Sequence, residues 1–182
     1  TTFIAKPNHT FAVSDFSAIE ARVIAWLAGE QWRLDVFNTH GKIYEASAAM
    51  MFDVPIESVT KGSPLRQKGK VAELALGYQG SVGALTKMDT SKSLSETEKE
   101  EIVRKWRAKN PAITMLWMQV DKHAKIALKS PGKKIVLAKY KNLTFLYDGK
   151  CLTFELPSGR KLFYQSPRFT TNKFGQESIK YM

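Results

Sequence analysis

The spacing of apolar residues predicts a mostly helical N-terminal part of the chain. The β-prone stretch Thr10–Asp15 is expected to form one short strand. After it, apolar residues recur every three or four positions, which is the period of an amphipathic helix. This helix is expected to open with a capping box of Ser17 and Glu20 and to stop at Gly29. Its predicted buried stripe consists of Ile19, Val23, Ile24 and Leu27.

Further helical patterns follow along the first two thirds of the chain. Proline is tolerated in the first turn of a helix, where its missing N–H costs nothing, so Pro64 and Pro111 each mark a helix start. A second capping box, Ser95 with Glu98, marks another. The expected segments are Ile43–Phe52, Pro64–Tyr78, a short helix and a mobile loop within Ser81–Lys92, Ser95–Lys109 and Pro111–Leu128.

The pattern changes after Gly132, where apolar and polar residues begin to alternate. Alternation with a period of two is typical of strands, and Asp148-Gly149 and Ser158-Gly159 are turn signals between them. The predicted strands are Ile135–Leu137, Leu143–Tyr147, Leu152–Leu156 and Leu162–Tyr164. Helices first and an antiparallel meander last indicate the α+β class.

Composition and charge narrow the function classes. The 182 residues suffice for one ordinary domain or two small ones. The 28 Lys and Arg exceed the 17 Asp and Glu by 11, which favours a polyanionic partner such as nucleic acid, although a basic surface can also serve only solubility. No apolar run is long enough to cross a bilayer, no signal peptide is evident, and the single Cys151 excludes an internal disulfide. We therefore expect an intracellular protein that does not enter the membrane.

The stretch Asp15–Arg22 is the first candidate for chemistry. Asp15 follows the predicted strand and precedes the predicted helix. A carboxylate in that position is suited to holding a divalent metal against a phosphate. A structural interpretation is equally open, in which Asp15 accepts hydrogen bonds from helix N–H groups and Glu20 only completes the capping box.

The stretch Arg66–Tyr78 is the second candidate. On a helix, Arg66, Lys70, Leu74 and Tyr78 share one face at steps of four residues. Two like charges at this spacing repel each other unless an anion bridges them, and the positive end of the helix lies close by. A triphosphate fits such a site. The alternative is a solvated basic face with Tyr78 in the core and Glu73 partly offsetting Lys70.

Together the two stretches resemble motifs A and B of A-family DNA polymerases such as bacterial DNA polymerase I. Asp15–Arg22 is similar to the motif A pattern D-Y-S-x-I-E-x-R, and Arg66–Tyr78 is similar to the motif B pattern R-x3-K-x7-Y-G. The motifs occur in the same order as in the family. The residues around them, Arg66–Gly80 and Leu156–Arg160, look most like the phage and prophage branch.

The resemblance implies a reaction and a metal site. In the family, a primer 3′-OH attacks the α-phosphate of a dNTP in two-metal phosphoryl transfer on primer-template DNA. Asp15 matches the motif A aspartate that binds both catalytic Mg²⁺ ions, and the backbone carbonyl of Phe16 matches a further ligand. Such an enzyme would act in the cytoplasm of a bacterial host or phage-infected cell. The sequence predicts no particular oligomeric state.

The resemblance also implies a nucleotide-binding site. Glu20 matches the glutamate that crowds the sugar 2′ position and excludes ribonucleotides. Arg66 and Lys70 match the pair that holds the triphosphate, and Tyr78 matches the tyrosine beside the nascent base pair. Leu74 stands where bacterial enzymes place a phenylalanine that stacks on the nucleotide.

Other positions depart from the family pattern. Tyr44 falls where many members have a histidine near the phosphates, and Gln79 replaces the glycine after the motif B tyrosine. Motif C, an H-D-E that supplies the second metal-binding aspartate, does not occur in the sequence. Asp148, next to Gly149, is interpreted as a turn residue.

The matched motifs suggest how the chain is divided. Residues 1–30 are expected to be a palm portion with motif A, and residues 31–131 a fingers-like helical region with motif B. Residues 132–182 are expected to be antiparallel strands that stop before motif C. We therefore expect a polymerase fragment that does not extend a primer by itself.

Two alternatives from other classes remain open at this stage. One is a non-catalytic basic module that binds nucleic acid through phosphates alone. The other is a metal-dependent nuclease that uses Asp15 and Glu20. A P-loop NTPase is excluded because the sequence has no G-x4-G-K-[ST].

Overall fold

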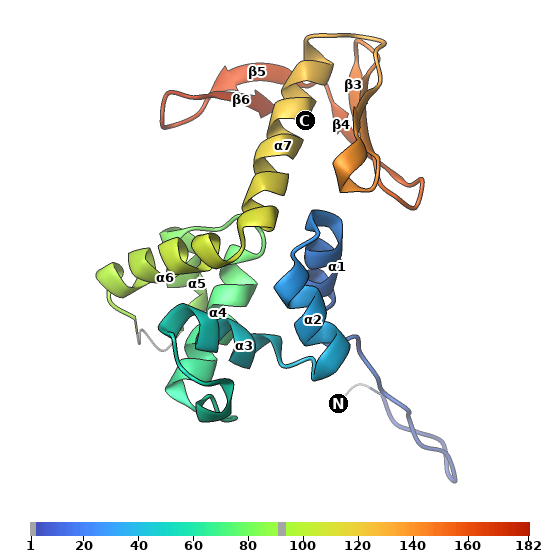
Figure 1. Cartoon of the computed structure of the whole chain (residues 1–182). Helices are drawn as coiled ribbons and strands as arrows, with labels where there is room; N and C mark the ends of the chain where they lie inside the picture. The colour runs from blue at the N-terminus through green and yellow to red at the C-terminus, as the bar shows by residue number, and fades with distance from the viewer. Residues whose placement is uncertain (1–2, 91–93) are drawn as a thin grey trace.

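A computed structural model of the chain describes residues 3–90 and 94–182. Helices occupy its first two thirds and strands the last third, so the α+β class is confirmed (Figure 1). The helices are α1 (Ile19–Ala28), α2 (Gln31–Thr39), α3 (Ile43–Phe52), α4 (Pro64–Leu76), α5 (Val82–Met88), α6 (Glu96–Lys109) and α7 (Pro111–Leu128), with short 3-10 turns at Ile56–Ser58 and Ala138–Tyr140.

Two helix starts have the side-chain caps that the sequence predicts. Ser63 caps α4, because its hydroxyl accepts a hydrogen bond from the Arg66 N–H at 3.2 Å. The capping box of Ser95 and Glu98 at the start of α6 has both of its hydrogen bonds. The short helix expected within Ser81–Lys92 is α5, whereas the mobile loop expected there falls partly on residues 91–93, outside the described residues.

The predicted capping box at α1 is wrong. The helix begins at Ile19, and its N-cap is Ala18 in a left-handed conformation with φ 49°. The Ser17 carbonyl instead accepts a hydrogen bond from Arg22 Nε at 2.9 Å. The stop at Gly29 is confirmed, but Ile19 and Val23 of the predicted buried stripe are 40% and 44% exposed, because that side of α1 borders a cavity.

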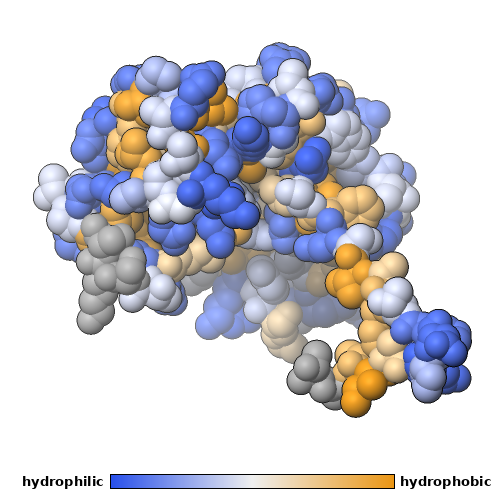
Figure 2. Space-filling view, turned by 90° about the horizontal axis from the view of Figure 1, so that it is seen from below, coloured by the Kyte–Doolittle hydropathy of each residue, from blue (hydrophilic) through white to orange (hydrophobic). Residues whose placement is uncertain are grey.

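The predicted strand at Thr10–Asp15 is also wrong. The segment is irregular, and Phe11 and Val13 are 57% and 92% exposed. Figure 2 shows the N-terminal segment projecting from the body of the molecule with hydrophobic residues on its surface. A strand needs a partner for its backbone N–H and C=O groups, and within the described residues this segment pairs with none. The β-prone composition alone therefore does not make a strand here.

The C-terminal third contains the predicted antiparallel meander. Strands β1 (Ile135–Leu137), β2 (Leu143–Tyr147), β3 (Cys151–Glu155) and β4 (Lys161–Gln165) pair in sequence order. The Asp148 carboxylate accepts hydrogen bonds from the N–H groups of Lys150 and Cys151, so it is the turn residue expected between β2 and β3. A second hairpin, β5 (Arg168–Thr171) with β6 (Glu177–Lys180), was not predicted.

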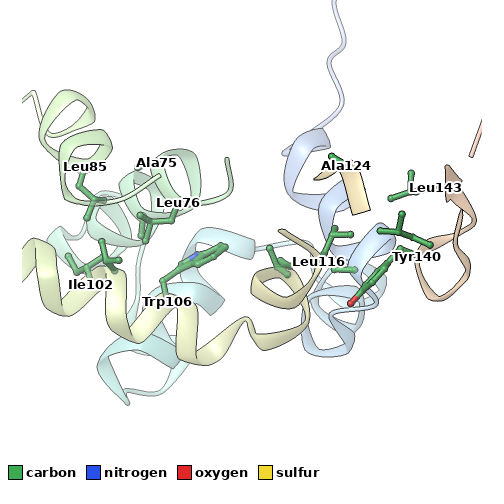
Figure 3. Close-up of a cluster of buried hydrophobic side chains, with 14 of the residues drawn as sticks. Ala75, Leu76, Leu85, Ile102, Trp106, Leu116, Ala124, Tyr140 and Leu143 are labelled. Carbon is green, nitrogen blue, oxygen red and sulfur yellow. The ribbon is translucent and has the colours of Figure 1, made fainter. Parts of the chain in front are cut away.

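The hydrophobic core runs through both parts of the chain. Helix α7 extends from the helical part to the strands (Figure 1). Figure 3 shows the core continuing from Leu76 and Trp106 in the helices to Leu116 on α7 and to Leu143 on the sheet. Trp106 is fully buried. Among the helices of residues 3–90 and 94–182, none combines the length and apolarity needed to span a bilayer.

Candidate nucleotide-binding site

One face of α4 carries the side chains expected to bind a nucleotide. Its apolar face, which includes Val71 and Leu76, is buried against α3 and α6. The opposite face leaves Lys70 exposed, Leu74 38% exposed and Tyr78, just after the helix, 68% exposed. The interpretation that Tyr78 belongs to the core is therefore excluded.

Helix α1 brings Glu20 to the end of this face. Since Ser17 does not cap α1, the Glu20 carboxylate is free of the capping role and contacts the Tyr78 hydroxyl. Partial desolvation, the Glu20 charge and this hydrogen bond raise the pKa of Tyr78 above its ordinary value. The motif A glutamate and the motif B tyrosine, 58 positions apart in sequence, thus lie side by side.

Arg66 lies in a cluster at the N-terminal end of the same helix. Its guanidinium is 5.7 Å from the centre of the Tyr44 ring, and its Nε donates to Glu45 Oε1 at 2.7 Å. Burial and the Glu73 charge raise the pKa of Tyr44, whereas the nearby Arg66 charge opposes the increase. The Tyr44 hydroxyl therefore stays protonated at neutral pH and can donate a hydrogen bond.

The structure does not join the two candidate metal ligands to this cluster. Asp15 and Phe16 lie in the exposed segment before α1, and Phe16 is 78% exposed. Within residues 3–90 and 94–182, Asp15 forms no hydrogen bond or ion pair. The same residues contain no group of three or more His, Cys, Asp or Glu side chains placed to hold a metal. Asp15 by itself therefore does not make a complete metal site.

The sequence analysis missed a buried polar network that positions α4. Glu73 does not offset the charge of Lys70. It points inward and forms an ion pair with Arg33 of α2, and the Arg33 side chain is fully buried. Trp106 Nε1 donates to Glu73 at 2.8 Å, and Arg33 donates to Asn110 at 3.0 Å. The sequence signal for this network was the single carboxylate of Glu73 among the apolar residues of α4, because a buried charge needs a partner.

A cavity of about 860 Å³ opens beside Glu20 and Tyr78. It lies between α1, the C-terminal end of α4, α7 and the sheet, and most of its lining is apolar. Ile24 and Leu116 are among the lining residues, and Arg33 and Glu73 also reach it. Glu20 and Tyr78 therefore stand at the edge of a large apolar cavity.

Comparison with known proteins places these features in a family. The profile described as DNA polymerase family A matches residues 1–130. A DNA polymerase of Bacillus phage SP02 is 57% identical over 183 aligned residues, which cover 100% of this chain and 28% of that protein. A DNA polymerase I of Pseudomonas aeruginosa is 33% identical over 47% of this chain and 9% of its own length.

A more distant phage relative fits the same picture. A DNA polymerase of Mycobacterium phage D29 is 29% identical over 55% of this chain and 16% of that protein. The chain thus spans less than a third of the length of each of these relatives. Since the family profile matches well over half of its residues, this chain belongs to DNA polymerase family A, in the branch represented by phage enzymes.

Proposed function

We propose that this chain forms the nucleotide-binding part of a DNA-directed DNA polymerase, which adds dNTPs to a primer 3′-OH on primer-template DNA. The contact between Glu20 and Tyr78 beside the exposed cationic face of α4 carries the proposal. This contact brings a residue of the motif A stretch and a residue of the motif B stretch together at one surface. The names of the relatives, all DNA polymerases, support the same assignment.

Each side chain on this surface has a role in the proposal. Lys70 and Arg66 bind the triphosphate near the positive end of α4, where the helix dipole also favours an anion. Glu20 lies against the sugar and leaves no room for a 2′-OH. Tyr78 offers its ring to the base pair. Leu74 supplies an aliphatic contact to the base instead of ring stacking.

The metal chemistry of the proposal begins from Asp15. When bound, two Mg²⁺ ions stabilise the charge that develops on the transferred phosphoryl group. Asp15 and the Phe16 carbonyl would supply one anchor, and the described residues contain no group of three or more His, Cys, Asp or Glu side chains placed to hold a metal. We therefore propose that the 182-residue chain binds nucleotide without catalysing extension.

Primer extension by the purified chain tests this proposal. With Mg²⁺, dNTPs and a primed template, we expect no extension but measurable dNTP binding, and DNA affinity that falls steeply with salt. Robust extension that disappears in Asp15→Asn would contradict the predicted inactivity. Magnesium-dependent strand cleavage without dNTP binding would instead favour a nuclease.

A further inference from the structure

The two cations on the nucleotide-facing side of α4 differ in their surroundings. Lys70 is exposed and has no ion-pair partner among the described residues. Arg66 is paired with Glu45, whose Oε1 is 2.7 Å from its Nε. The side chains of Arg66 and Glu45 are only 26% and 14% exposed. Half of the cationic pair that is expected to receive the triphosphate is therefore already neutralised.

Close packing of α3 against α4 holds Glu45 in front of Arg66. A Cβ at Gly69 would lie 2.3 Å from the Tyr44 carbonyl oxygen and 2.9 Å from Ala48 Cβ, so the two helices touch at Gly69. Glu45 is in the first turn of α3 and Arg66 in the first turn of α4. This packing keeps the first turns of the two helices close together, and rotation of the side chains is enough to separate the pair.

The carboxylate of Glu45 is charged at neutral pH. Burial raises its pKa, but the hydrogen bond and charge of Arg66, together with the charge of Lys42, outweigh burial and leave the pKa below its ordinary value. An anion of the chain itself thus occupies the position at Arg66 that a phosphate oxygen would otherwise take.

We propose that Glu45 competes with the incoming triphosphate for Arg66 and thereby sets the affinity of the site. This inference rests on the proposed function. Binding of a triphosphate requires the Arg66 guanidinium to exchange a carboxylate for phosphate oxygens. The released Glu45 carboxylate then faces the polyphosphate with like charge, which weakens binding further. Lys70 alone makes the first contact, because no acidic residue in the described part of the chain forms an ion pair with it.

Tripolyphosphate binding to the chain and to Glu45→Gln tests the inference by calorimetric titration. Glutamine keeps the shape of the side chain and removes its charge. We expect Glu45→Gln to bind about 1.5- to five-fold more tightly than the unmodified chain, the range for a partly exposed ion pair. The matched control is Glu98→Gln, which removes the carboxylate paired at 2.8 Å with Lys68 of the same helix. It should leave the affinity unchanged.

A double-mutant cycle shows whether the effect passes through Arg66. If it does, Glu45→Gln in an Arg66→Gln background should tighten binding much less, because only the like-charge repulsion of the polyphosphate is then relieved. Equal affinities of the unmodified chain and Glu45→Gln would overturn the inference while leaving the proposed function standing. If neither binds tripolyphosphate, the proposed function fails and the inference fails with it.

Discussion

At the scale of single residues, the orientation of α4 depends on a buried charge. Glu73 lies on the apolar side of the helix, one position from exposed Leu74, and its carboxylate receives hydrogen bonds from Arg33 and Trp106. These contacts join α4 to α2 and α6. The rotation of α4 about its axis, and hence the direction in which Lys70 points, is fixed by this network.

Removing the Glu73 carboxylate should therefore destabilise the fold strongly. In Glu73→Leu the Arg33 charge stays buried without a counter-charge, and we expect a loss of about 3–5 kcal/mol in the free energy of unfolding. Urea denaturation measures this loss in the free energy of unfolding. The control is Glu155→Gln, which removes the carboxylate of an exposed ion pair with Lys161 and should cost less than about 1 kcal/mol. Equal losses in the two variants would contradict the assigned role.

The sequence predicted some residues of the site and missed others for a physical reason. The face of Lys70, Leu74 and Tyr78 follows from helix geometry alone, because residues four apart align on one side. The pair of Glu45 with Arg66 spans 21 positions and two helices, so no local spacing indicates it. A partner across helices is determined only by how they pack.

At the scale of elements, α6 shows how a helix start is fixed by short-range signals. The Glu98 carboxylate accepts a hydrogen bond from Lys68 of α4 and another from the Ser95 N–H. Both bonds lower the pKa of Glu98, which falls from 4.5 to about 2, and the bond from Lys68 makes the largest contribution. The carboxylate thus links the capping of α6 to its contact with α4.

Glu98 should give the stability of the chain a dependence on pH. Because its folded pKa is below the unfolded value, its ionised form stabilises the fold above pH 4.5, and this contribution disappears as pH falls toward about 2. The difference in unfolding free energy between the unmodified chain and Glu98→Gln should be constant above about pH 5 and shrink below it. Urea titrations at a series of pH values measure the difference; one that does not change with pH would contradict the assigned contacts.

Strands were predicted well only where their partners follow directly in sequence. The meander β1 to β4 has short turns and an alternating pattern, so local signals suffice. The exposed β5–β6 hairpin lacks a buried face, and its pattern was therefore weak. The expected strand at Thr10–Asp15 failed for the opposite reason: the pattern was present, but no strand of residues 3–90 and 94–182 pairs with it.

At the scale of the whole molecule, the proposed function depends on the proximity of Glu20 on α1 to Tyr78 at the end of α4. The fold class could be predicted because the hydrophobic period changes after Gly132. The contact of Glu20 with Tyr78 could be expected only through the resemblance to motifs A and B, since it depends on tertiary packing around α7. The sequence thus indicated candidate residues, and the structure shows which of them lie close together.

The central claim is that the exposed side of α4 binds a nucleoside triphosphate at the face that carries Lys70. Titration of a dNTP into the chain, Lys70→Ala and Lys68→Ala tests it most directly. Both variants lose one positive charge from the same helix, but Lys68 is paired with Glu98 on another side. We predict an affinity about ten-fold lower for Lys70→Ala, as for one lost charge-assisted contact, and little change for Lys68→Ala. Equal weakening in both variants, or no loss in Lys70→Ala, would contradict the account.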